Sequence, residues 1–335
     1  MKITVIGLGY VGIVAASCLA NRGHHVTGVD VDPERVMILR SGRLPIVVVG
    51  VEPGDTRSLD VVSGMNNGND APRIVTDITS AEMVKYASNA FLATRISFIN
   101  EMAALCERVG ASIDTVSQSL AMDPRTGSRI HAGVGYGGSC FPKDVRALDH
   151  LALISDANVD LLRSVITVNN RQRLRPLHAL RERFNGGIGG LCVAVLGLAF
   201  KPDTDDVREA PALDLIRALI DDGASVSAYD PQAGNSARRH LPSSVALADD
   251  PAAATKGAHA VVLMTEWDQI VNAGWETIAQ GMRPPRYLFD GRNVLDAALM
   301  ERLGFEYRGV GRSADVNGHV RTGPRPVQGA NGRHA

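Results

Sequence analysis

The residues best suited to covalent chemistry lie in the stretch GVGYGGSCFPKD, from Gly133 to Asp144. A run rich in glycine precedes a single thiol, Cys140, and an ammonium group and a carboxylate, Lys143 and Asp144, follow it closely. Glycine lets a backbone approach a ligand closely, and a thiolate is a nucleophile. The stretch is therefore a candidate catalytic loop, and the alternative is a turn in which the cysteine only fills space.

A second chemical signature stands at the start of the chain. The segment KITVIG predicts a strand, GLGYVG places Gly7, Gly9 and Gly12 in GxGxxG spacing, and the helical run IVAASCLANRG leads to a second strand that ends at Asp30. Such glycines permit a tight turn and close approach of a pyrophosphate to a helix N-terminus. An acidic residue at this distance accepts hydrogen bonds from a ribose diol, which favours NAD over NADP; glycines that serve only a packing turn are the alternative.

Composition excludes several classes of function. Lys plus Arg number 35 against 36 for Asp plus Glu, so no overall basic field attracts nucleic acid or an anionic membrane. The sequence shows neither the pattern of a signal peptide nor an apolar run of membrane-spanning length. The 4 cysteines are scattered without a CxxC pair, which indicates reduced thiols in the cytoplasm and no metal site.

The order of the expected elements predicts an α/β protein with two Rossmann-like doubly wound domains joined by a helical segment. The first of these domains looks truncated, because a long helical pattern, with Ser80 as its expected cap and Gly110 as its expected end, has already begun by residue 80, before a full set of strands is complete. The run VVVG predicts one buried strand before it. After it we expect a second helix in IDTVSQSLAM and, beyond the cysteine loop, one helical stretch over residues 146–184. The expected parts are a truncated NAD-binding Rossmann domain at 1–79, a central helical domain with the cysteine loop at 80–184, a second Rossmann-like domain at 185–310 and a disordered tail at 311–335.

Four motifs in order, GLGYVG, GYGGSCFPKD, LGLAFKPDTDDVREAP and FDGRN, resemble those of the UDP-glucose/GDP-mannose dehydrogenase family. The similarity covers about residues 1–45 and 74–310. It implies oxidation of the primary alcohol of a nucleotide sugar to a carboxylate with two NAD molecules, in a homodimer or higher homo-oligomer, for use in polysaccharide biosynthesis. Within the family the motifs favour UDP-glucose over GDP-mannose as the substrate, and the resemblance implies that the Rossmann-like domain at 185–310 binds the UDP-sugar.

The resemblance also implies the catalytic residues. Cys140 would add to the aldehyde intermediate, and the thiohemiacetal would then be oxidised to a thioester that water hydrolyses. Lys85 and Asn89, which are expected on one face of a helix, would donate to the alkoxide and the oxyanion. Asp144 would assist water and proton transfer, whereas Lys143 is assigned only a structural role.

A further set of residues is implied to bind rather than react. They are Arg125, Gly137, Gly138, Lys201 and Arg292 for the nucleotide sugar and Arg208 for the cofactor. Arg125 would reach the substrate of a neighbouring subunit, the glycines would let the loop approach the sugar, and the cations of the second α/β domain would meet phosphates and hydroxyls. Taken alone, each of these charges is more typical of a solvated surface.

The chain also departs from the family pattern. It lacks the long stretch that relatives carry between the second strand and the Lys85 helix, and with it later strands of the NAD domain, a threonine that orders water and a glutamate in a PEF segment. Two hypotheses follow. The chain is either an NAD-dependent dehydrogenase with slow thioester hydrolysis or a non-catalytic nucleotide-sugar-binding or oligomerisation protein of the same family.

We expect the first domain to bind NAD more tightly than NADP, because the Asp30 carboxylate accepts from a ribose diol and repels a phosphate. Isothermal titration calorimetry with both cofactors measures the preference, which should be roughly tenfold or more for a repulsion of about 1.4 kcal/mol. Asp30→Asn should reduce the preference, and tighter binding of NADP to the unaltered chain would contradict the assignment.

Overall fold

The computed structural model describes residues 2–6, 25–29, 47–52, 54, 73–128 and 130–312. The chain separates into two compact units, Met1–Ser88 and Asn89–Ala335, and each is described by itself. The residues of the expected dinucleotide motif lie outside the described residues; they are Gly7, Gly9, Gly12 and Asp30.

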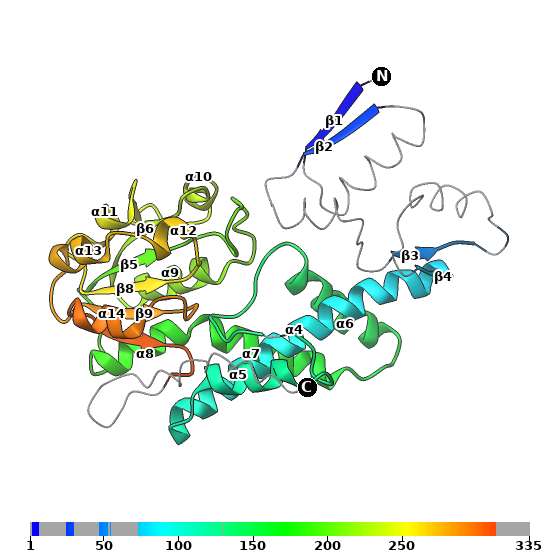
Figure 1. Ribbon diagram of the computed structural model, residues 1–335, viewed down its shortest axis with the longest axis horizontal. Coiled ribbons are helices and arrows are strands. Elements are labelled where there is room, and N and C mark those ends of the chain that lie inside the picture. Colours follow the sequence, from blue (N-terminus) through cyan, green and yellow to red (C-terminus); the bar gives the residue numbers. More distant parts are fainter. Residues whose placement is uncertain are drawn as a thin grey trace, which may run out of the picture. The chain divides into compact units, whose positions relative to one another are not determined.

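Pairs of parallel strands make up the described sheets of the first unit (Figure 1). β1 (Lys2–Ile6) pairs with β2 (His25–Val29), and β3 (Val47–Gly50) pairs with β4 (Arg73–Thr76). Parallel neighbours need a crossover of a dozen or more residues, which the chain between β1 and β2 is long enough to supply. The strands expected around the glycine motif and in VVVG are confirmed, and β4 is an additional strand that the sequence pattern did not indicate.

The long helix α4 (Ile78–Val109) has 32 residues and is about 48 Å long. It begins before Ser80, which was expected to cap it: the Asp77 carboxylate instead accepts from the backbone N–H of Ser80 at 2.8 Å and from its hydroxyl at 2.7 Å. These hydrogen bonds hold the pKa of Asp77 below its ordinary value. Gly110 ends the helix as predicted, with a φ of 74° that suits glycine.

Further helices follow α4 along the chain. They are α5 (Ile113–Met122), α6 (Phe141–Ile154), α7 (Asp160–Arg173) and α8 (Arg175–Arg183). The predicted α5 is confirmed, whereas the helical stretch expected as one piece after the cysteine loop is divided. Leu174 interrupts it, and Pro176 occupies the first turn of the next helix, where its missing N–H is tolerated.

A parallel sheet of six strands forms the second α/β domain, in the order β10-β9-β8-β5-β6-β7. The strands are β5 (Cys192–Leu196), β6 (Ser225–Tyr229), β7 (Ala246–Leu247), β8 (Ala260–Leu263), β9 (Tyr287–Asp290) and β10 (Glu306–Gly309). This is the strand order of the doubly wound dinucleotide-binding fold, with the direction of winding reversed between β5 and β8. The predicted fold class is confirmed.

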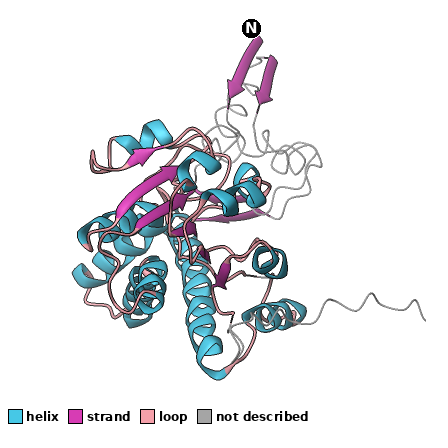
Figure 2. Cartoon of the chain, turned by 90° about the vertical axis from the view of Figure 1, so that its left-hand side faces the viewer, coloured by secondary structure: helices cyan, strands magenta, loops and turns pink. Residues whose placement is uncertain are grey.

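Helices cover both faces of this sheet (Figure 2). They are α9 (Pro211–Asp221), α10 (Gly234–Arg238), α11 (Pro251–Thr255), α12 (Asp268–Val271), α13 (Trp275–Gly281) and α14 (Ala297–Arg302). α9 packs on β6 and against α7 and α8, while α11 packs on β5 and β6 beside α13. The central helices are therefore part of the covering of the sheet.

One hydrophobic core joins the helices to the sheet. Ile99 on α4 and Leu180 on α8 belong to the same buried cluster as Leu263 on β8. Arg312 forms an isolated backbone bridge with Ser112, so residues 311 and 312 of the expected tail are placed in the structure. The rest of the expected disordered tail lies outside the described residues. Among the described residues, no helix combines the length and the apolar character needed to cross a membrane.

Leu263→Ala should lower the free energy of unfolding by about 2–5 kcal/mol, because the side chain is fully buried in β8 and truncation leaves a cavity. Leu153→Ala is the matched control, since this leucine is 68% exposed and its truncation should change the free energy of unfolding by no more than about 0.5 kcal/mol. Urea denaturation followed by circular dichroism measures both, and equal losses would contradict the described core.

Candidate active site

The loop Gly133–Gly138 crosses the protein interior, and its residues are all buried. The helices hold its backbone. Asn100 on α4 accepts from the Gly133 N–H at 2.9 Å, and Gln172 on α7 donates to the Gly133 carbonyl at 2.6 Å. Asn169 on α7 accepts from the Tyr136 N–H at 2.9 Å and donates to the Tyr136 carbonyl at 3.2 Å.

The second α/β domain holds the same loop from its other side. Val134 donates through its backbone to the carbonyl of Gly291 at 3.1 Å, and Gly138 donates to the carbonyl of Arg208 at 2.9 Å. Buried backbone groups need such partners, because an unpaired buried N–H or C=O is costly. The loop is therefore fixed jointly by the helices and by the sheet domain.

Gly137 and Gly138 are required by the packing of the chain itself. A β-carbon at Gly137 would overlap the carbonyl oxygen of Glu209, and one at Gly138 would lie 2.8 Å from the Phe200 ring. Gly138 also has a φ of 90°, which side-chain-bearing residues rarely adopt. Both glycines line the cavity described below, and their approach to a sugar stays a prediction.

Cys140 directly precedes α6 and is exposed. Its Sγ lies 3.7 Å from the Ser139 hydroxyl, and the N-terminal end of a helix favours negative charge. Nearby, the Arg208 guanidinium donates to the Asp206 carboxylate at 2.8 Å. This hydrogen bond raises the pKa of Arg208, and the Cys140 side chain raises it further. The predicted cofactor-binding Arg208 thus lies within electrostatic range of the thiol.

Asp144, in the first turn of α6, is fully buried. Asn89 donates to one carboxylate oxygen of Asp144 at 2.7 Å, and the Lys143 ammonium lies 3.8 Å from the other. The structure therefore pairs two of the predicted catalytic residues with each other, and it gives Lys143 a contact with one of them. Lys85 belongs to the first unit, where its ammonium lies 5.2 Å from the centre of the Tyr86 ring; its catalytic role stays a prediction.

A cavity of about 620 Å³ opens beside the Gly133–Gly138 loop. Its lining includes Cys140, Lys201 and Arg292 as well as both predicted glycines, so five of the predicted site residues face one space. It lies beyond the carboxyl ends of β5, β8 and β9, from which Lys201, Glu266 and Arg292 follow. Ligands of doubly wound sheets bind at this place, outside the point where the direction of winding reverses.

The cations of the cavity are held differently. Arg292 donates through Nε to the Met264 carbonyl at 2.8 Å, and the same nitrogen lies 3.1 Å from the Glu266 carboxylate. Lys201 is exposed, with its ammonium 5.7 Å from the centre of the Phe200 ring. Arg292 is thus oriented before a ligand arrives, whereas Lys201 can follow one, and both suit an anionic phosphate group.

Several cavity residues were not singled out from the sequence. Glu266 lies in the TEW segment just beyond β8, and Phe200 precedes the predicted Lys201. Glu266 could have been predicted from its position just after the carboxyl end of a parallel strand, because ligands of such sheets bind there. Arg125 does not line this cavity: its side chain is 88% exposed and pairs with Asp123 at 2.6 Å, so its predicted reach to a neighbouring subunit stays a prediction.

The fold and the site define a nucleotide-binding α/β protein with a thiol in its ligand cavity. Domains of one protein family match along the chain: the NAD binding domain of the UDP-glucose/GDP-mannose dehydrogenase family matches residues 1–65, its central domain 79–171 and its UDP binding domain 194–297. The chain belongs to the UDP-glucose/GDP-mannose dehydrogenase family.

Individual relatives support the same grouping. The chain is 43% identical over 273 residues to the UDP-glucose 6-dehydrogenase YwqF of Bacillus subtilis, covering 81% of this chain and 61% of that protein. It is 48% identical over 238 residues to the UDP-glucose 6-dehydrogenase of Pseudomonas aeruginosa, covering 69% of this chain and 52% of that protein. The chain therefore spans little more than half the length of these curated relatives.

A solved structure is also similar. A UDP-glucose dehydrogenase from the hyperthermophilic archaeon Pyrobaculum islandicum superimposes with a TM-score of 0.72 at 28% identity, covering 92% of this chain and 97% of that chain. Together with the matched NAD binding domain, the parallel register of β1 and β2, in which Ile6 lies opposite Val29, fits the βαβ unit that binds a dinucleotide. NAD is confirmed as the cofactor of the family to which the chain belongs.

Lys201→Ala and Arg292→Ala should each weaken the binding of UDP by roughly tenfold, since a hydrogen bond to a charged group contributes about 1.5–3 kcal/mol. Lys256→Ala removes an exposed lysine of the same domain that does not line the cavity, and it should leave affinity unchanged. Calorimetry with UDP measures all three without turnover. Wild-type affinity in both cavity variants would rule out this cavity as the nucleotide site.

Proposed function

We propose that this chain oxidises the primary alcohol of UDP-glucose to the carboxylate of UDP-glucuronate with NAD, in the cytoplasm. The observation that carries the proposal is the shared cavity, in which the Cys140 thiol faces the same space as Lys201 and Arg292. A nucleotide sugar needs both features, because its diphosphate requires cations and its oxidation passes through an aldehyde that must be retained. The similarity to the UDP-glucose 6-dehydrogenases favours UDP-glucose over GDP-mannose.

The residues of the cavity bind the substrate in an orientation that brings its reacting carbon to the thiol. Arg292 and Lys201 hold the diphosphate, and the glycines of the Gly133–Gly138 loop let the sugar lie against the backbone. Arg208, whose guanidinium lies within electrostatic range of Cys140, is the residue of this domain proposed to contact the cofactor. Cys140, at the end of the loop, is then left facing the primary alcohol of the sugar.

NAD, bound by the first α/β domain, supplies the hydride acceptor at each oxidation. Loss of a hydride and a proton converts the alcohol to an aldehyde, and the Cys140 thiolate adds to its carbonyl carbon to form a thiohemiacetal. Loss of a second hydride and of the hydroxyl proton gives a thioester, and attack by water releases the carboxylate and regenerates the thiol. Lys85 and Asn89 donate to the oxyanions of these steps, and Asp144 accepts a proton from the attacking water.

Thioester hydrolysis is proposed to be the slowest of these steps. By the resemblance, relatives carry a threonine and a PEF glutamate for this step, and this sequence contains no PEF segment. Asp144 is then the predicted catalytic carboxylate left to activate water. Asp144 is fully buried and already accepts from Asn89 at 2.7 Å, which restricts its access to water. We therefore propose that acyl-enzyme on Cys140 accumulates.

The long helix α4 provides a surface for a homodimer. Phe91, Phe98, Leu105 and Val109 are spaced so that they follow one face of the helix, and their exposed fractions are 66%, 49%, 52% and 67%. Large apolar side chains gathered on one face mark an interaction surface. In such a dimer, Arg125 would reach the substrate bound to the partner subunit.

Incubation with UDP-glucose and NAD should produce a burst of two NADH per chain, followed by a slow phase, because the second hydride is released before the thioester is hydrolysed. Absorbance measures the NADH, and mass spectrometry of the intact protein measures the acyl adduct. Cys140→Ser should abolish the adduct, whereas Cys192→Ser, which removes a cysteine outside the cavity, should retain it.

Each alternative gives a different result in the same experiment. Steady turnover without an adduct would contradict the proposed slow hydrolysis. Absence of both NADH and adduct would contradict the dehydrogenase activity and favour the non-catalytic member of the family. A burst with GDP-mannose that exceeds the burst with UDP-glucose would overturn the choice of substrate.

A further inference from the structure

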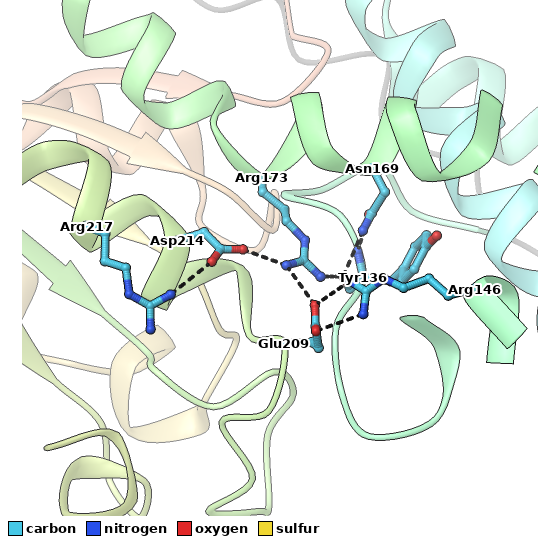
Figure 3. A network of polar contacts seen from close by, with 7 residues as sticks. All are labelled: Tyr136, Arg146, Asn169, Arg173, Glu209, Asp214 and Arg217. Carbon is cyan, nitrogen blue, oxygen red and sulfur yellow. Dashed lines mark hydrogen bonds and ion pairs between the residues drawn. The ribbon is translucent and has the colours of Figure 1, made fainter. Parts of the chain in front are cut away.

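A network of charged side chains lies against the cysteine loop on the side of the sheet domain (Figure 3). It connects α6, α7, α9 and the loop itself through Tyr136, Arg146, Asn169, Arg173, Glu209, Asp214 and Arg217. Glu209 lies two residues before the start of α9. Its carboxylate accepts hydrogen bonds from Arg146 on α6 and Arg173 on α7. None of these residues contributes a reacting group to the proposed chemistry.

Arg146 ties Glu209 to the helix that follows Cys140. Its two terminal nitrogens each donate to a different oxygen of the Glu209 carboxylate at 3.0 Å, in the paired geometry that makes an Arg–carboxylate contact strong. The hydrogen bonds from Arg146, with a smaller contribution from Arg173, hold the pKa of Glu209 below its ordinary value. Arg146 lies in the second turn of α6, six residues after Cys140, so this pair ties the N-terminal part of α6 to Glu209.

Arg173 ties the same carboxylate to the glycine loop. Its side chain is only 7% exposed, and its guanidinium donates to the Tyr136 carbonyl at 3.0 Å. It pairs with Asp214 on α9 at 2.6 Å and with Glu209 at 3.5 Å. A buried cation needs such counter-charges, so the position of Arg173, and with it the Tyr136 peptide, depends on the acidic residues of the sheet domain.

The backbone around Glu209 contacts the loop as closely as its side chain does. The carbonyl of Glu209 packs directly on Gly137, and the preceding carbonyl, that of Arg208, accepts from the Gly138 N–H at 2.9 Å. Glu209 also has a φ of 53°, an unfavourable value for a residue with a side chain, which persists where surrounding contacts impose it. The Glu209 side chain, through Arg173, and the backbone of Arg208 and Glu209 thus hold the stretch Tyr136–Gly138 that leads to Cys140.

We propose that Glu209 is a positioning residue that sets the orientation of Cys140 toward the cavity by tying α6 and the glycine loop to the nucleotide-sugar domain. The proposal rests on the role of Cys140 given under the proposed function. Loss of the carboxylate releases Arg146 and leaves Arg173 with a single acidic partner. The loop then moves independently of the domain that carries Lys201 and Arg292, so bound substrate and thiol no longer keep their alignment.

The test uses the full chain with Glu209→Gln, Arg146→Gln and the double variant. Asp222→Asn is the matched control, because Asp222 forms a comparable two-point pair with Arg181, at 2.6 and 2.7 Å, away from the loop. Hydrogen–deuterium exchange of residues 133–145 is measured without ligand. The affinity for UDP-glucose and the protection that UDP-glucose gives Cys140 against iodoacetamide are then measured on the same proteins.

Glu209→Gln should speed exchange of residues 133–145 by about tenfold and abolish most of the protection of Cys140, while UDP-glucose affinity changes less than about threefold. Arg146→Gln should match it, and the double variant should add little, because both remove the same pair. Glu209→Asp should restore part of the protection. Asp222→Asn should leave loop exchange and protection at wild-type values.

Wild-type exchange and protection in Glu209→Gln would overturn the proposal, as would equal effects of Asp222→Asn, which would reduce the role of Glu209 to general stability. The same measurements distinguish a failure of the proposed function from a failure of the proposed role of Glu209. A chain that binds no UDP-glucose contradicts the function, while the ligand-free exchange of residues 133–145 still decides whether Glu209 holds the loop.

Discussion

The structure depends on one constraint, which is that the buried backbone of the Gly133–Gly138 loop must find hydrogen-bond partners. Water cannot reach it, so side chains from α4 and α7 and carbonyl groups from the sheet domain supply them. The same partners bring Cys140 to the edge of the cavity. A requirement of folding and a requirement of the proposed chemistry are thus met by one set of contacts.

The sheet supplies the other half of the site. Parallel strands end at a common edge, and the reversal of winding between β5 and β8 leaves a crevice there. Lys201 and Arg292 come to this crevice because they lie in the segments that follow β5 and β9, and residues of the loop line it as well. The cavity therefore requires both the helices and the sheet, and this agrees with the hydrophobic core that joins them.

Residues that line the cavity could be found from the sequence, whereas the contacts that hold them in place could not. Cys140, Lys201 and Arg292 lie in short motifs with local signatures, and the structure brings these residues to one cavity. The contacts of Asn169, Gln172 and Arg173 could not be predicted, because they join segments more than 30 residues apart and the run NNRQR resembles an ordinary polar helix face.

Local competition explains the smaller errors in the predicted elements. Asp77 caps α4 because its carboxylate accepts from both the N–H and the hydroxyl of Ser80, which had been the expected cap. The strand β7 has only 2 residues and is stabilised by its neighbour in the sheet rather than by its own pattern. The start of α4 and the presence of β7 depend on such contacts, so hydrophobic periodicity alone does not predict them.

A crystal structure of the chain with UDP-glucose bound would show whether Lys201, Arg292 and Cys140 share one substrate. The proposed function predicts diphosphate oxygens within about 4 Å of the Lys201 ammonium and the Arg292 guanidinium, the distance that defines an ion pair. It also predicts that the primary alcohol of the sugar faces the Sγ of Cys140 beside Gly137 and Gly138. A nucleotide bound elsewhere on the second domain, with the sugar turned away from the thiol, would contradict it.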